Sequence, residues 1–143
     1  MSPGPRRAAD LAAHIRAESA RLAEACTACG ACVRACPMVP GIPSVAEADA
    51  GTVAAGMRDV LRGGEGIQEG LTWIAACTRS ALCTDACPER IDPAFMMRLA
   101  SMRARGALGG PPRVPVKDDP NWSARVKAFA RMTLTKEEQA QWL

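Results

Sequence analysis

Cysteines dominate the chemistry that this sequence can perform. The chain has 143 residues and seven cysteines, and four of them follow the spacing C-x2-C-x2-C-x3-C-P. These four are Cys26, Cys29, Cys32 and Cys36, and Pro37 follows the last. Each iron of a cubane cluster needs one thiolate besides its bridging sulfides, and this spacing wraps three thiolates around one cube. Where a protein holds two clusters, the fourth cysteine of such a run ligates the other one.

A second cysteine group begins 51 residues after the first, counted from Cys26 to Cys77. It contains Cys77, Cys83 and Cys87-Pro88, and Ser80 stands where the second cysteine of the first motif would be. In crossed ligation, each motif gives its last cysteine to the cluster of the other motif. This assigns one cluster, a [4Fe-4S], to Cys26, Cys29, Cys32 and Cys87. It leaves Cys36, Cys77 and Cys83 for the second cluster, so that every cysteine has a predicted role.

Ser80 leaves the type of the second cluster open. The corner iron is absent, or the serine oxygen ligates it weakly, or water or a group from a partner does so. Thiolate is the softer and better iron ligand, and serine would first have to lose its proton. We therefore expect one [4Fe-4S] and one [3Fe-4S] cluster. The alternative is a second [4Fe-4S] cluster with a non-cysteine ligand.

Other interpretations of these residues fit less well. A structural zinc site needs four ligands, usually in two separated pairs, and seven cysteines with two Cys-Pro endings do not match that. The odd count also disfavours disulfides. His14 is expected to be a solvated residue of a surface helix. Trp73 is expected to pack over the second cluster rather than relay electrons, with Met96 and Met97 as core filler beside the same cluster.

The segments around the first cysteine group predict helices. Apolar residues recur at helical spacing between Arg7 and Ala25, at Leu11, Ile15 and Leu22. Ser44 to Glu47 has the spacing of a capping box. A further helical face follows, at Val53, Met57, Val60 and Leu61, and Gly63-Gly64 should end that helix.

A similar pattern surrounds the second cysteine group. A short helix from about Glu65 to Ala76 should bring Trp73 and Ile74 to the interior. Asp92-Pro93 has the types expected of an N-cap and a first helical residue, and this helix should end near Gly106. No alternating strand pattern appears, so the predicted fold is mainly α.

The C-terminal part is expected to form a tail outside the cluster-binding fold. Residues 109–120 are rich in Gly and Pro and predict an extended linker. A helix is expected over 121–134, followed by a capping box at Thr135 and Glu138. The chain therefore divides into an N-terminal helical arm (1–19), a cluster-binding domain (20–106), and a linker with a docking helix (107–143).

Composition excludes several classes of function. The formal charge is only +3 and no basic run is present, which argues against a nucleic-acid partner. No stretch is long and apolar enough to predict a membrane span. Charged residues follow Arg6-Arg7, so no apolar signal core is predicted there. Clustered cysteines in a chain of this kind favour a cytoplasmic, metal-binding protein.

The paired motifs, with helices between them, resemble the α-helical ferredoxin domain over about residues 20–106. This domain occurs in the small iron–sulfur subunit of heterodisulfide reductase and in the iron–sulfur subunit of succinate dehydrogenase and fumarate reductase. The group Cys77, Cys83 and Cys87-Pro88 is similar to the succinate dehydrogenase pattern, which holds a [3Fe-4S] cluster. The chain lacks the [2Fe-2S] domain that precedes this pattern in succinate dehydrogenase. In length and layout it looks more like the small iron–sulfur subunit of heterodisulfide reductase.

The resemblance implies an electron-transfer subunit that is not an enzyme on its own. It would relay electrons between a flavin and iron–sulfur subunit and a cysteine-rich catalytic subunit of the heterodisulfide reductase type, within a hetero-oligomer. The alternative is a subunit that passes electrons from a flavoprotein dehydrogenase to a quinone or membrane partner. No nucleotide-binding glycine loop and no hydrolase-type arrangement of side chains is apparent in the sequence.

Overall fold

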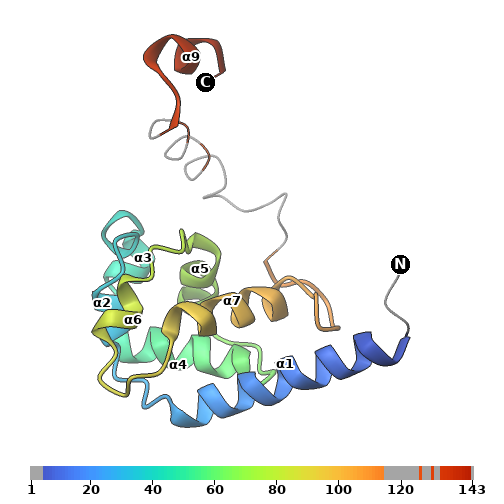
Figure 1. Cartoon of the computed structure of the whole chain (residues 1–143). Coiled ribbons are helices and arrows are strands. Elements are labelled where there is room, and N and C mark those ends of the chain that lie inside the picture. The colour runs from blue at the N-terminus through green and yellow to red at the C-terminus, as the bar shows by residue number, and fades with distance from the viewer. Residues whose placement is uncertain (1–4, 115–125, 127–129, 131–132, 143) are drawn as a thin grey trace.

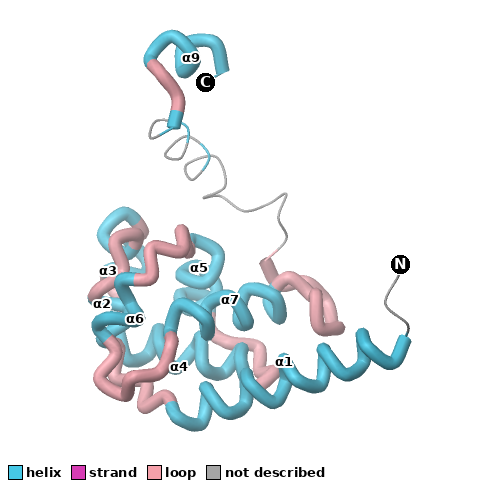
Figure 2. Tube along the Cα trace, in the orientation of Figure 1, coloured by secondary structure: helices cyan, strands magenta, loops and turns pink. Residues whose placement is uncertain are grey.

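The computed structural model describes residues 5–114, 126, 130 and 133–142. Its main body contains α1 (Pro5–Ala25), α2 (Ala31–Arg34), η1 (Val39–Gly41), α3 (Pro43–Ala46), α4 (Ala50–Leu61), α5 (Gln68–Ala76), α6 (Leu82–Ala86) and α7 (Pro93–Ala104). Within the described residues there is no strand, as Figure 2 shows. The mainly α fold is therefore confirmed.

The long helix α1 supports the body along its C-terminal half only. Leu22 is buried there, and the buried Ser19 hydroxyl donates to the Ile15 carbonyl at 2.8 Å. Leu11 belongs to the same predicted apolar face but is 59% exposed. Its part of α1 extends beyond the other helices of the body (Figure 1), so no neighbour covers this side chain. His14 is exposed on this helix, as expected.

The core lies between α4, α5 and α7, which pack against one another. Trp73 and Ile74 of α5 are 1% and 2% exposed, which confirms that this helix brings them inside. The apolar face predicted for α4 is fully buried, at Val53, Met57, Val60 and Leu61. The helix ends as expected, because Gly63 follows it with a φ of +89°, a left-handed conformation that favours glycine.

The capping box predicted at Ser44 is wrong. Helix α3 begins two residues earlier, with Ile42 rather than Ser44 as N-cap, and no side chain caps it. Pro43 takes the first helical position because its fixed φ suits a helix start and it has no N–H to satisfy. The side-chain cap nearby belongs to α4 instead, where the Asp49 carboxylate accepts a hydrogen bond from the Thr52 N–H at 2.8 Å.

The start of α5 also differs slightly from the prediction. The helix begins at Gln68 rather than near Glu65. Gly66 has a φ of +73° and its N–H donates to the Asp59 carboxylate at 2.9 Å, so this segment is a turn anchored to the end of α4. Glycine is suited to that left-handed position.

The predicted start of α7 is confirmed. The Asp92 carboxylate accepts from the Phe95 N–H at 3.0 Å, and Pro93 is the first helical residue. The helix ends at Ala104, and Gly106 follows in the left-handed conformation with a φ of +78°. Cap and stop signals thus located this helix within about two residues.

The tail is described only in part. The capping box at Thr135 and Glu138 is confirmed, since each side chain accepts from the other residue's N–H, at 3.3 Å and 2.8 Å. It opens α9 (Lys136–Trp142). The helix predicted over 121–134 lies mostly outside the described residues. Helix α1 runs unbroken through residue 19, and the division of the chain into three parts stays a prediction.

Candidate metal centres

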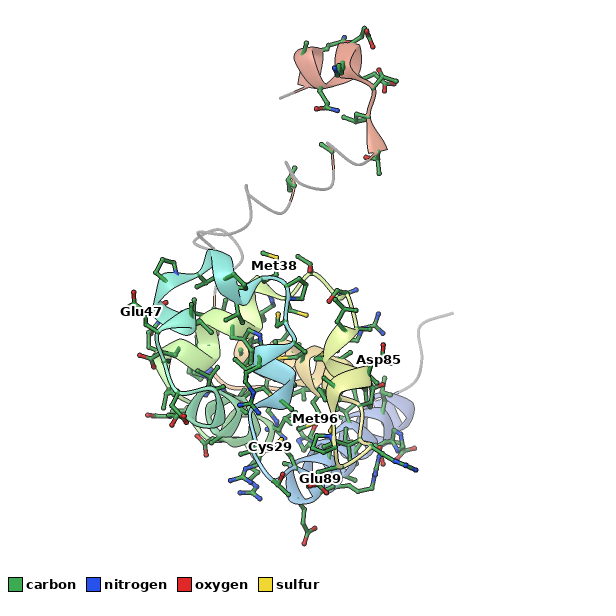
Figure 3. All side chains as sticks on the ribbon, turned by 90° about the vertical axis from the view of Figure 1, so that its left-hand side faces the viewer. Cys29, Met38, Glu47, Asp85, Glu89 and Met96 are labelled. Carbon is green, nitrogen blue, oxygen red and sulfur yellow. The ribbon has the colours of Figure 1, made fainter. Side chains whose placement is uncertain are left out.

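Two short helices at one end of the body carry the cysteine loops. Helices α2 and α6 pack against each other there, at the end opposite the N-terminal half of α1 (Figure 1). Figure 3 looks onto this end, with Cys29 and Glu89 near its lower edge and Met38 near its top. Cys26, Cys29 and Cys77 lie in the loops that precede these helices, Cys32 and Cys83 lie within them, and Cys36 and Cys87 follow them.

The two loops repeat the same backbone conformation. The residues two places after Cys26 and Cys77 are Ala28 and Arg79, with φ values of +55° and +62°. The residues that cap α2 and α6 are Gly30 and Ala81, with φ values of +77° and +62°. Three of these four left-handed residues are not glycine, and such conformations cost free energy that the surroundings must offset. The repeat in sequence is therefore also a repeat in structure.

Hydrogen bonds follow the same repeat. The Val33 N–H donates to the Gly30 carbonyl at 3.1 Å, and the Thr84 N–H donates to the Ala81 carbonyl at 3.0 Å. The second pair lies 51 residues after the first, which is also the spacing between the two cysteine groups. Ser80 thus holds, between Arg79 and Ala81, the backbone position that corresponds to Cys29.

The first cavity gathers cysteines from both motifs. The cysteines that line it are Cys26, Cys29, Cys32 and Cys87. Apolar side chains line it as well, among them Met57 and Met96, both fully buried. Cys87 reaches this cavity because α6 delivers it next to the first loop. The structure therefore brings together the four residues that crossed ligation assigns to the [4Fe-4S] cluster.

The second cavity gathers the remaining three cysteines. It is lined by Cys36, Cys77 and Cys83, together with Ser80. Trp73 and Met97 also line it, so their expected place beside this group is correct. Met96 was expected here too, but it lies at the first cavity, since consecutive residues of α7 point in different directions.

The donor sets suit polynuclear clusters. Within the described part of the chain, no three Cys, His, Asp or Glu side chains converge closely enough to hold a single metal ion. The thiols instead surround two cavities, as the iron corners of a cluster require. The Ala28 N–H also donates to the Cys26 sulfur at 3.4 Å, the type of hydrogen bond that modulates cluster sulfur.

Arginines fix the first loop through its carbonyl oxygens. Arg58 donates to the Cys26 carbonyl at 2.8 Å and Arg34 to the Cys29 carbonyl at 3.1 Å. Arg62 donates just before the loop, to the Ala23 carbonyl in the last turn of α1, at 3.3 Å. Arg79 and Arg90, which flank the second loop, are both exposed. The three arginines that donate at the first loop and just before it could not be identified from spacing, because Arg58 and Arg62 come from the distant helix α4 and its end.

Two of the thiols at these cavities, those of Cys32 and Cys83, hold their protons tightly when no metal is bound. Burial raises the pKa of the Cys32 thiol to about 12, and the negative charge of Cys26 contributes to the rise. Burial likewise raises the pKa of Cys83, with Cys77 as the next cause. A cationic cluster reverses this balance, because it stabilises the thiolate that it binds.

Iron loading of the first cavity should therefore strengthen as the pH rises from 7 to 9. Cys32 stays protonated across this range and must release its proton to bind iron, so each pH unit should raise the apparent affinity about tenfold from this residue alone. Anaerobic competition with a chelator in the presence of sulfide measures this, after correction for the chelator's own titration. An affinity that does not change with pH would contradict a protonated Cys32.

Comparison with protein families agrees with this geometry. Residues 22–91, just under half of the chain, match the family model described as 4Fe-4S dicluster domain. These residues form an iron–sulfur, ferredoxin-like domain. The match spans both cysteine loops and the helices α4 and α5 between them. It indicates an electron-transfer iron–sulfur protein that binds a 4Fe-4S cluster. Comparisons with curated proteins and with solved structures gave no match.

Proposed function

We propose that this chain is a non-catalytic electron-transfer subunit with two iron–sulfur clusters. Cys26, Cys29, Cys32 and Cys87 would hold a [4Fe-4S] cluster, and Cys36, Cys77 and Cys83 would hold a [3Fe-4S] cluster. The observation that carries the proposal is the pair of cavities. The last cysteine of each motif lines the cavity that holds the other cysteines of the opposite motif. Bound clusters supply reversible one-electron chemistry, which no side chain of this site provides by itself.

The packing of α2 against α6 supports a conduit rather than two independent sites. Cys36 and Cys87 lie just after these two helices, and each lines the cavity of the opposite loop. The two cavities are therefore held at a fixed separation by one helix pair. The buried helices α4, α5 and α7 support them from within.

Each cavity reaches the surface at a different segment. The first does so beside Cys29 and Glu89, both exposed. The second does so beside the exposed residues Thr78 to Ala81. Two exits suit one electron donor and one acceptor, each on another polypeptide.

A heterodisulfide-reductase-like complex fits this arrangement best, in the cytoplasm. The chain would connect a flavin and iron–sulfur subunit to a cysteine-rich catalytic subunit of the type found in that enzyme. The two cysteine motifs, which share their clusters across the helix pair, and the predicted docking tail support this assignment. Among the described residues, no helix is long and apolar enough to cross a membrane.

The second candidate is a subunit that passes electrons from a flavoprotein dehydrogenase to a quinone or membrane partner. The specific observation in its favour is Ser80 in the second cavity, where a three-cysteine set resembles the succinate dehydrogenase pattern. Anaerobic co-purification from the native source distinguishes the two. A cysteine-rich partner supports the first candidate, and a membrane anchor supports the second.

Removal of residues 115–143 should weaken partner binding while the iron content stays unchanged. The segment begins directly after Arg113 and Val114, whose N–H groups both donate to the Ala104 carbonyl of α7. Its α9 contributes to neither cavity. Affinity for the co-purified partner and iron per chain are the two measurements.

Leu11→Ser is a matched control for this deletion, because it removes an exposed apolar side chain from the opposite end of the chain. It should leave both measurements near the values of the full chain. Loss of iron from the truncated chain would instead mean that the tail belongs to the cluster-binding fold. Unchanged partner affinity would contradict a docking role.

A further inference from the structure

Trp73 carries a buried polar group that the protein leaves without a partner. The residue is 1% exposed, and its indole Nε1–H donates to no acceptor among the described residues. Buried Trp N–H groups usually find an acceptor, because a buried donor without one costs about 1–3 kcal/mol. The only other buried side-chain nitrogen or oxygen without a partner in the described residues belongs to Arg103, away from both cavities.

The position of Trp73 indicates where its acceptor lies. The side chain lines the second cavity together with Cys36, Cys77 and Cys83. None of these sulfurs accepts the indole hydrogen bond in the structure. The hydroxyls of Thr78 and Ser80, which also line the cavity, do not accept it either, and Ala94 and Met97 offer no strong acceptor. An acceptor must therefore come from what fills the cavity.

We propose that the Trp73 Nε1–H donates a hydrogen bond to a sulfur of the second cluster and raises its reduction potential. This inference rests on the proposed function, because it requires a cluster in that cavity. A hydrogen bond to sulfur stabilises the more negative, reduced state more than the oxidised state. No bond or proton is transferred; the indole changes only the equilibrium between the two oxidation states.

The fold holds Trp73 in place for this role. It lies one turn before the end of α5, and the Cys77 N–H bonds back to the Ile74 carbonyl at 3.4 Å. The end of α5 therefore forms one rigid unit that contains both Trp73 and Cys77, the first cysteine of the loop. At the first cavity the corresponding apolar lining comes from Met57 and Met96, which have no hydrogen-bond donor. Trp73 thus makes the two sites chemically different.

Trp73→Phe tests the inference because it keeps an aromatic ring and removes the N–H. The equilibrium constant for reduction of the second cluster should fall about tenfold, which is 59 mV for one electron. The first cluster should keep its potential and serves as an internal reference. Redox titration followed by EPR measures both. Hyperfine spectroscopy of the paramagnetic second cluster should also lose one strongly coupled exchangeable proton.

Met97→Leu is the matched control, since it changes another buried side chain of the same cavity without changing a donor. It should leave the second potential close to that of the wild type. Equal shifts in the two variants would show an effect of packing and would overturn the inference. So would a Trp73→Phe protein with its second potential and its exchangeable proton unchanged.

The wild-type protein separates this inference from the proposed function. If it shows only one cluster, the proposed two-cluster function fails, and the tryptophan inference fails with it. If both clusters are present and Trp73→Phe has no effect on the second, only the inference about Trp73 fails. Iron content and EPR of the wild type are therefore measured first.

Discussion

Cys87→Ala should remove the first cluster and leave the second, although Cys87 belongs to the second motif. Its side chain lines the first cavity with Cys26 and Cys32, and the cavity loses one of its four thiols. A chain with about seven irons should then retain about three, the content of a [3Fe-4S] cluster. Iron analysis and EPR of the anaerobically purified variant measure this.

Cys36→Ala should give the reverse result. This cysteine closes the first motif but lines the second cavity, so its loss should leave about four irons in an intact [4Fe-4S] cluster. Each variant serves as the control for the other, because both remove one thiol that follows a short helix. If Cys87→Ala instead lost the signal that Cys83→Ala loses, each loop would hold its own cluster and crossed ligation would be wrong.

The effect of either substitution should be large because the cavities are part of the core. The cavities reach from the loops to the fully buried Met57, Met96 and Trp73. With the cluster gone, the thiols and apolar side chains around that cavity lose their common partner. Cluster binding and folding are coupled in such a site, so each variant should also unfold at a lower temperature.

Cap and turn signals predicted the helices well because they act locally. Asp92-Pro93 located the start of α7 and Gly63 the end of α4, since each satisfies or terminates a helix with atoms a few residues away. The capping box predicted at Ser44 is wrong because Pro43, the residue before it, takes the first helical position, so that Ser44 already lies inside the helix. Leu11 belongs to the predicted apolar face of α1 but is exposed, because periodicity does not reveal how far the neighbouring helices extend.

For the metal sites, the sequence predicted the groups of cysteines and, with Trp73 and Met97, only part of their surroundings. The spacing of the motifs indicates which cysteines belong to one cluster, and the structure brings the same cysteines together at each cavity. The contacts of Arg58 with the Cys26 carbonyl and the unsatisfied indole of Trp73 depend on how distant helices pack. Such contacts carry no spacing signal, so they could be found only in three dimensions.

Ser80→Cys should convert the second site to a four-iron cluster. Arg79 and Ala81 on either side hold the same left-handed conformations as the neighbours of Cys29, so a cysteine here would reach the cavity as Cys29 does. Ser80 is exposed, so the larger sulfur should find room. Iron should rise from about seven to about eight per chain, and the EPR signal of an oxidised three-iron cluster should disappear.

Cys29→Ser is the reciprocal change and the matched control. Cys29 is exposed and adopts the same backbone position in its loop, so the substitution should make the first site a copy of the second. About one iron should be lost and a second three-iron signal should appear. If the wild-type chain already holds about eight irons and Ser80→Ala lowers that number, the serine oxygen is itself a ligand. The single oxygen-for-sulfur difference between the repeated loops would then determine how the last iron is bound, not whether it is present.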